Sequence, residues 1–357
     1  MMDMDAAQLQ RRVQAGELIE NLSLRAINLA GVALAGGIFR QVDFEGADLS
    51  GCNLEHSLFI DCNLAHATLA HSKLPHASFS QCNMPHTRFT GAVLSTLIFS
   101  ENNLQHADFS DIQARAVQFV GCPLHNSHFQ RAQLSKCALS AVTLDDSDFT
   151  DAQLVKTTFH RLDLRHYRPT RTRFEQVNFF ECQQQGVDYS SMVLTECLFT
   201  RNTLDEANFA SAVLHRSLFH GASLQRANLN EVQADYAQFV GANLAHADCS
   251  ASLLNHTAWI DATLTATNFT RSQLVQAIFT RSQAPGTAFA DARLDGADFT
   301  RADISGASFE GASLARTQFH RAVTADTRWG DKTEILENDP DLLEAENWSL
   351  SQQASYR

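Results

Sequence analysis

A large apolar residue recurs at every fifth position through most of this chain. From Leu24 to Trp329 there are 62 positions whose numbers end in 4 or 9, here called the large positions, and they hold 27 Leu and 23 of the 24 Phe. Two residues before each lies a small position, with a number ending in 2 or 7, and none of the 124 positions holds Asp, Glu, Lys or Arg. Because an unpaired charge is costly inside a protein, both sets are predicted to point into a repeating core.

Leu and Phe alternate within this repeat with a period of ten residues. Large positions ending in 4 carry 22 Leu and 2 Phe out of 31, whereas those ending in 9 carry 21 Phe and 5 Leu out of 31. A four-faced coil of 20 residues stacks Leu on Leu and Phe on Phe, while a three-faced coil of 15 would stack unlike side chains. The pattern therefore predicts a four-faced solenoid of about 15 coils.

The repeating unit is a small residue, a polar residue, Leu or Phe, and two further polar residues, as in ADLSG, ANFAS, ANLNE and ADFTR. This unit resembles the pentapeptide-repeat family over about 310 of the 357 residues. The resemblance implies an all-β fold, a right-handed quadrilateral parallel β-helix (solenoid) with one pentapeptide on each face. We expect the solenoid to cover residues 21–330, between an N-terminal helical cap at 1–20 and an acidic C-terminal cap or tail at 331–357.

A short helix is predicted before the repeat, because the first coil of a solenoid needs a cover for its core and its strand edge. Residues 5–15 begin with Asp5 as an N-cap, place Leu9 and Val13 on one face and stop at Gly16.

A second helix is predicted after the repeat, where Asp339 is an N-cap and Pro340 takes the first helical position. The tail from Asp331 to Arg357 holds seven acidic and two basic residues. It is either a second lid or a mobile acidic arm.

Cysteine and histidine are concentrated between residues 62 and 89, which raises the question of a zinc site. Seven of the eight Cys take small positions and Cys249 takes a large one, whereas His66, His86 and His106 point outward. The wall of the coil separates the two sets, so we expect no metal site and no cofactor, and we interpret the cysteines as core residues. The three histidines should stack on successive coils, as a solvated polar corner or as a ladder that takes a metal ion or senses pH.

The repeat keeps its register but loses its usual residues between 161 and 189, where Pro169 and Gln184 occupy large positions. We therefore expect the coil geometry to be disturbed there. Phe180, the one Phe outside the large positions, also lies here. The segment concentrates basic residues at Arg161, Arg165, Arg168, Arg171 and Arg173. It is either a partner contact, since local rules tend to break at functional sites, or drift in a long repeat array.

One predicted face carries more outward apolar residues than the others. Flanking the ladder from Phe39 to Phe319, 11 of 30 outward positions hold a large apolar residue, against six on the face from Leu34 to Leu314 and none on the other two. This apolar stripe consists of Ile38, Leu58, Ile60, Ile98, Val120, Phe180, Leu198, Leu218, Val240, Ile260 and Ile278. It marks either a partner or homodimer contact, or the preference of aliphatic and β-branched residues for a flat β-ladder.

Composition narrows the choice of partner and compartment. The net charge of -13 argues against direct nucleic-acid binding, which needs a basic surface. The eight cysteines include no CxxC pair, which favours a reducing compartment. We find no signal peptide and no membrane-spanning apolar run, and therefore expect a cytoplasmic protein, with secretion without a cleaved signal left open.

An enzyme is disfavoured, because ladders fill the interior and the outward residues form convex rows without a pocket. The chain also lacks a Gly-rich phosphate loop, a nucleophile elbow and an HExxH motif. The sequence therefore favours a non-enzymatic protein-interaction scaffold or adaptor.

Two subgroups of the pentapeptide-repeat family offer more specific readings. One resembles B-form DNA and binds DNA gyrase, but the repeat region here has 23 basic and 29 acidic residues, and Arg281, Arg301 and Arg321 form a basic row. The short N-terminal helix with QAGE running into the coils resembles members associated with bacterial type VI secretion, which implies a role in effector loading. We prefer a bacterial scaffold of that kind, with a DNA-mimic binding DNA gyrase or topoisomerase as the alternative and a secreted effector as a second alternative.

Overall fold

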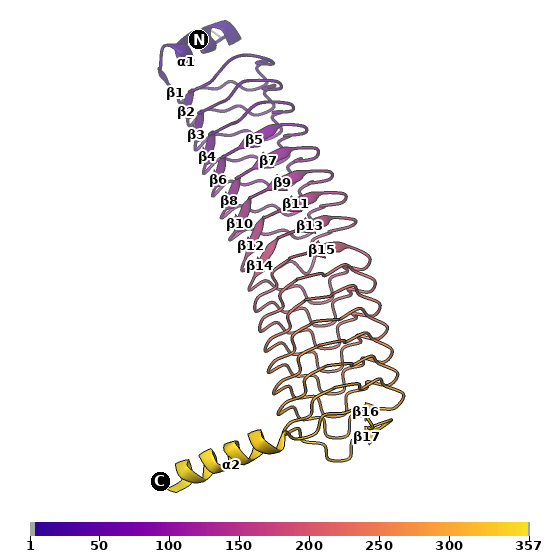
Figure 1. Ribbon diagram of the computed structural model, residues 1–357. Helices are drawn as coiled ribbons and strands as arrows, with labels where there is room; N and C mark the ends of the chain where they lie inside the picture. Colours follow the sequence, from indigo (N-terminus) through magenta and orange to yellow (C-terminus); the bar gives the residue numbers. More distant parts are fainter. Residues whose placement is uncertain (1–3, 356–357) are drawn as a thin grey trace. The chain divides into compact units, whose positions relative to one another are not determined.

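The protein folds as a mostly-β parallel solenoid of about 16 turns with a short helix at each end, as Figure 1 shows in a computed structural model that describes residues 4–355. Each segment pairs in parallel with the segment 20 residues later. One coil makes four such pairings at intervals of five residues, Ser23 with Asp43, Asn28 with Asp48, Ala33 with Asn53 and Ile38 with Leu58. The four-faced coil predicted from the alternation of Leu and Phe is confirmed.

The chain divides into two compact units. Unit 1 contains the residues up to Val187 together with Met192–Leu198, and unit 2 contains Asp188–Ser191 together with the residues from Phe199 onward. The helix α1 (Ala6–Gln14) and two regular sheets belong to unit 1. The second helix, α2 (Pro340–Ser355), belongs to unit 2.

Regular strands occupy two faces of unit 1 (Figure 1). The nine-stranded sheet contains β1 (Leu18–Glu20), β2 (Ile38–Arg40), β3 (Leu58–Ile60), β4 (Ser78–Ser80), β6 (Ile98–Ser100), β8 (Gln118–Val120), β10 (Ala138–Ser140), β12 (Thr158–His160) and β14 (Asn178–Phe180). The six-stranded sheet contains β5 (Val93–Ser95), β7 (Gln113–Arg115), β9 (Gln133–Ser135), β11 (Gln153–Val155), β13 (Arg173–Glu175) and β15 (Val193–Thr195). In unit 2, β16 (Ser308–Phe309) pairs with β17 (Arg328–Trp329), and isolated bridges such as Leu218 with Gln238 join the coils.

The core consists of ladders of stacked side chains at the large positions. The rings of Phe59 and Phe79 stack with centroids 4.6 Å apart and planes 9° from parallel. Rings of neighbouring ladders meet edge to face, as do Phe99 and Phe109 at 5.9 Å and 76°. Both arrangements suit the aromatic quadrupole, so the ladders contribute favourable contacts beyond the area they bury.

Corners of the coil are tight turns that need a left-handed residue. The amide of Ala47 donates to the carbonyl of Phe44 at 2.9 Å, and Gly46 at the third turn position has a φ of 67°. This geometry is that of a type II turn. Non-glycine residues adopt it as well, for example His66 with a φ of 58°. The left-handed region costs a non-glycine residue roughly 1–2 kcal/mol, so pairing between coils must offset that cost at such corners.

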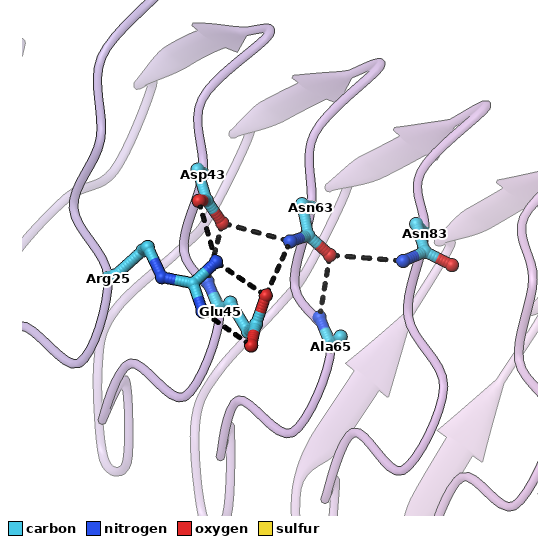
Figure 2. A network of polar contacts seen from close by, with 6 residues as sticks. All are labelled: Arg25, Asp43, Glu45, Asn63, Ala65 and Asn83. Atoms are coloured by element: carbon cyan, nitrogen blue, oxygen red, sulfur yellow. Dashed lines mark hydrogen bonds and ion pairs between the residues drawn. The ribbon is translucent and has the colours of Figure 1, made fainter.

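Polar ladders join successive coils on the outer surface of unit 1. In Figure 2 the side-chain amide of Asn83 donates to Asn63 at 3.1 Å, and that of Asn63 donates to Asp43 at 2.9 Å. The guanidinium of Arg25 reaches Asp43 at 3.1 Å and both carboxylate oxygens of Glu45 at 2.6 Å. The ladder of amides therefore ends in an ion pair near the first coils.

The helix α1 has the predicted position and face. Its N-cap Asp5 forms a capping box with Gln8, and Leu9 and Val13 are buried. Gly16 follows with a φ of 73°. The buried face packs against β1 and so covers the first coil.

The helix α2 also starts where the sequence predicts, with the side chain of Asp339 accepting from the amide of Leu342 at 3.0 Å. The helix projects to one side of the last coils in Figure 1, and its Glu346 contacts Arg301 and Arg321 on those coils. Backbone pairing continues past Trp329, because the amide of Phe319 donates to the carbonyl of Leu336 at 2.8 Å. Backbone pairing therefore attaches the tail to the last coils as far as Leu336.

Among residues 4–355, neither helix has the length and apolar character needed to cross a membrane.

Candidate protein-interaction surface

In unit 1 the apolar stripe lies on the outer surface of the nine-stranded sheet. Ile38 and Ile98 are each 41% exposed and Val120 is 37% exposed, whereas Leu58 and Ile60 are half-buried. Ile38 lies directly beside Leu58 across the β2–β3 pair. The outward placement of these side chains is confirmed, and their contact with a partner stays a prediction.

Phe180 lies at the edge of this sheet, on β14. Its ring stacks on that of His160 on β12, with centroids 5.6 Å apart and planes 3° from parallel. Leu198 belongs to the same unit and pairs with Asn178 through a bridge. Both apolar side chains are half-buried, which leaves part of each open to solvent.

In unit 2 the stripe continues at the same place in the coil. Leu218, Val240 and Ile260 are half-buried, and Ile278 is 38% exposed. Bridges join Leu218 to Gln238 and Ala258 to Ile278. The stripe residues of this unit therefore lie on coils held by isolated bridges rather than on named strands.

Strand geometry alone does not account for the stripe. The six-stranded sheet of unit 1 has the same regular strands, yet its outward positions are mostly polar or charged, as at Gln113, Gln133 and Arg173. Only Val93, Val155 and Val193 are large and apolar among the 12 outward positions of its six strands. The nine-stranded sheet holds a large apolar residue at seven of 18 such positions, so a general preference of β-ladders for aliphatic residues accounts for only part of the stripe.

The arginines of the irregular segment are paired with acids of the same unit. Arg165 contacts Asp163 at 2.6 Å and Arg168 contacts Asp146 at 2.6 Å. The guanidinium of Arg171 contacts Asp151 at 2.7 Å. These exposed pairs neutralise much of the local positive charge. Arg173 lies on the six-stranded sheet, so the structure does not bring it to the face that carries Phe180.

A disturbance of the coil is confirmed at this segment. The amide of Asn126 donates to the carbonyl of Asp145 at 2.9 Å, whereas the equivalent amide of Asp146 donates to His166 at 3.1 Å rather than to Arg165. The pairing thus shifts by one residue at this corner. Pro169 and Tyr167 are nevertheless buried, so the core continues through the segment.

The predicted histidine ladder forms on the surface of unit 1. His66 stacks on His86 with centroids 4.9 Å apart, and His86 stacks on His106 at 4.7 Å. Desolvation lowers the pKa of His86, and the neighbouring His106 and His66 lower it further. A charge on either neighbour therefore disfavours a proton on His86.

All eight cysteines are buried and free, as their inward positions predict. Burial raises the pKa of the Cys137 and Cys182 thiols to about 11. Within the part of the chain that the structure describes, no group of three or more His, Cys, Asp or Glu side chains is placed to hold a metal ion.

One polar cluster in unit 2 escaped the sequence analysis. The carboxylate of Glu346, on α2, lies among Arg301, His320 and Arg321. Because Arg301 and Arg321 are 20 residues apart, the sequence does place them in one surface row. The repeat pattern contains no signal that this row contacts a residue of the tail.

Comparison with known families identifies the repeat. The profile of the pentapeptide repeat region matches residues 32–109 and 132–209, and the profile of pentapeptide repeats in eight copies matches residues 193–231, 207–244, 242–281 and 286–322. The chain belongs to the pentapeptide-repeat family.

Solved pentapeptide-repeat structures resemble the chain at low sequence identity. HetL, a protein involved in heterocyst differentiation regulation from the cyanobacterium Nostoc sp. strain PCC 7120, is 22% identical, and the match covers 88% of this chain and 97% of HetL with a TM-score of 0.26. A trypsin-treated variant of QnrB1, a plasmid-mediated fluoroquinolone resistance protein, is 18% identical, with 64% and 95% coverage and a TM-score of 0.33. A search of curated proteins found no match.

Proposed function

We propose that this pentapeptide-repeat protein is a non-enzymatic scaffold or adaptor that binds a protein partner, or a second copy of itself, through the apolar stripe. The observation that carries the proposal is that large apolar residues are more frequent among the outward strand positions of the nine-stranded sheet, at seven of 18, than among those of the six-stranded sheet of the same unit, at three of 12. Continuation of the stripe on the bridge-paired coils of unit 2 supports the same reading.

The exposed area of the stripe suits an interface built from several modest contacts. Fully burying one Leu or Ile side chain from water stabilises by about 1.5–3 kcal/mol, and the most exposed stripe residues are 41% exposed. Each therefore contributes about 1 kcal/mol when a partner covers it. Several must be covered together to offset the entropic cost of association.

The interior of the coils is filled with side chains, which favours binding on the outer surface over catalysis inside. Phe, Leu and the small residues at the inward positions fill the space that a substrate would need, and side chains such as Phe119 and Trp259 are fully buried. Charged side chains of the kind that catalysis uses, such as those of Asp111 and Arg131, face solvent and form an ion pair with each other at 2.6 Å.

The partner is identified by affinity purification of the full-length tagged chain from a bacterial lysate, with mass spectrometry of the retained proteins and light scattering of the purified chain. We expect either a specific retained protein or a mass of two chains. Retention of type VI secretion components would support effector loading, and retention of gyrase subunits would instead support topoisomerase binding. A monomer that retains nothing above an unrelated bait would contradict the proposal.

A further inference from the structure

The helix α2 is held against the coils of unit 2 mainly through one carboxylate. An oxygen of Glu346 lies 2.6 Å from the guanidinium of Arg301, and its other oxygen lies 3.2 Å from Nε2 of His320. The guanidinium of Arg321 contacts the same carboxylate and also donates to the side chain of Asn347 at 2.7 Å. Three basic side chains from two successive coils therefore converge on one acidic side chain.

The site includes one buried side chain with an unsatisfied polar atom. The side chain of His320 is 1% exposed, and its Nδ1 has no hydrogen-bond partner among the described residues. Desolvation alone would raise the pKa of Glu346, but hydrogen bonds from His320 and Arg301 and the charges of Arg301 and Arg321 hold it below the ordinary value of 4.5. The carboxylate is therefore present as an anion at neutral pH.

Apolar side chains hold α2 only in part. Leu342 is 45% exposed, whereas Leu343 is half-buried. A cleft of about 580 Å³ lies beside the contact, lined by Arg301, Arg321, Ala345, Glu346 and Ser349. Salt screens ion pairs that are partly exposed, so the contact of α2 with the coils weakens as the ionic strength rises.

When α2 leaves, the two guanidinium groups and the imidazole lose their acidic partner. Guanidinium groups bind carboxylates with defined geometry, and the seat of Glu346 shows that a carboxylate carried on a helix fits. A nucleic-acid backbone fits less well, because it needs a longer run of free cations. The next arginine in the row, Arg281, is already paired with Asp261 at 2.7 Å.

We propose that Arg301, His320 and Arg321 form a binding site for a carboxylate on an acidic helical segment of a partner protein, and that α2 keeps this site closed with Glu346. Glu346 of the same chain occupies the site until a segment of the partner displaces α2. His320 takes the same row of the coil as Val240 and Ile260, but the site shares no residue with the apolar stripe, and its test does not depend on the partner that the stripe binds.

The test uses a fluorescein-labelled peptide of residues 339–351, DPDLLEAENWSLS, and measures its anisotropy with the full-length chain at low salt. Two variants vacate the site, Glu346→Gln and a chain that ends at Asn338. Glu344→Gln is the matched control, because Glu344 is an exposed acid on the same helix. We expect both vacated variants to bind the peptide at least about tenfold more tightly than the wild type and the control, a difference of about 1.4 kcal/mol.

Adding Arg301→Gln and Arg321→Gln to Glu346→Gln should abolish peptide binding, with folding checked by far-UV circular dichroism. The proposal is overturned if the vacated variants bind no better than the wild type or if the arginine replacements leave binding intact. Displacement of the peptide by an equal concentration of DNA duplex would also overturn it, in favour of a phosphate site.

Discussion

At the scale of single residues, many small positions tolerate hydroxyl and thiol groups because these groups find an acceptor in the preceding coil. The Ser57 hydroxyl donates to the carbonyl of Leu34 at 3.0 Å, and the Thr267 hydroxyl donates to that of Leu244 at 2.8 Å. In both cases the acceptor lies 23 residues earlier. A buried polar group with such a partner costs little, whereas a charged side chain at the same position would lack its counter-charge.

The inward register is tested by a pair of neighbouring substitutions. Phe119 is fully buried and stacks on Phe99 at 5.0 Å, whereas Gln118 beside it is exposed. We expect Phe119→Asp to lower the free energy of unfolding by more than about 4 kcal/mol and Gln118→Asp to lower it by less than about 1 kcal/mol. Chemical denaturation measures both, and equal losses would contradict the assigned register.

The thiols offer a second test at this scale. Burial raises the pKa of Cys52 and Cys137 to about 11 and that of Cys197 to about 12, so the reactive thiolate is scarce at neutral pH. We expect a disulfide reagent such as DTNB at pH 8 to leave the native chain unmodified and to label all eight cysteines after unfolding. A thiol that reacts within seconds in the native protein would show that at least one cysteine is not a core residue.

At the scale of elements, the histidine ladder should make unit 1 sensitive to acid. The pKa of His86 lies below its ordinary value of 6.5, so near that pH the unfolded chain binds more protons than the folded one. Protonation therefore favours unfolding as the pH falls through 6.5. Above that range the residue is neutral in both states and makes no such contribution.

The substitution His86→Asn tests this contribution without changing the corner, because Asn126 takes the equivalent place two coils later with a φ of 57°. We expect the stability difference between variant and wild type to shift in favour of the variant as the pH falls from 8 to 5. Chemical denaturation at several pH values measures the shift. A difference that is constant across this range would show that the stacked rings do not interact electrostatically.

Most elements could be predicted because a period of five allows only one inward register. The caps of α1 and α2 were also readable, since Asp5 and Asp339 are local signals. The sequence could not show which faces form regular strands and which are joined only by isolated bridges, because both arise from the same pentapeptide pattern. His320 occupies an outward position, yet it is buried. Its burial accompanies a contact with Glu346, 26 residues away, that follows no periodicity.

The apolar stripe itself was readable from the sequence, because rows of residues 20 apart must share a surface once the coil is known. The exposure of Ile98 and Ile278 agrees with that reading. The irregular segment was less informative. Its arginines are conspicuous in the sequence, but three of them form ion pairs with Asp146, Asp151 and Asp163. The pattern of basic residues alone could not indicate these partners.

At the scale of the whole molecule, each of the two units presents its own part of the stripe on a stack of coils. In a solenoid each coil contacts only its neighbours, so stability is close to a sum of local terms. Outward substitutions on a few coils should therefore leave the rest of the chain folded. This property allows each part of the stripe to be removed without loss of the protein.

The most direct test of the binding role compares three triple variants with the wild type. Leu58→Ser, Ile98→Ser and Phe180→Ser replace three stripe residues of unit 1, and Leu218→Ser, Val240→Ser and Ile260→Ser replace three of unit 2. The matched control is Val93→Ser, Val155→Ser and Val193→Ser, which removes the outward apolar residues of the six-stranded sheet. Circular dichroism confirms that all three chains are folded.

The measurement is the amount of partner, or of second chain, that each full-length protein retains, quantified by mass spectrometry and light scattering. If the stripe is the binding surface, at least one stripe variant should lose about 2 kcal/mol of affinity, because most of the replaced side chains are half-buried and contribute less than the most exposed ones, and the control should retain its partner. Retention by all three variants, or an equal loss in the control, would contradict the account.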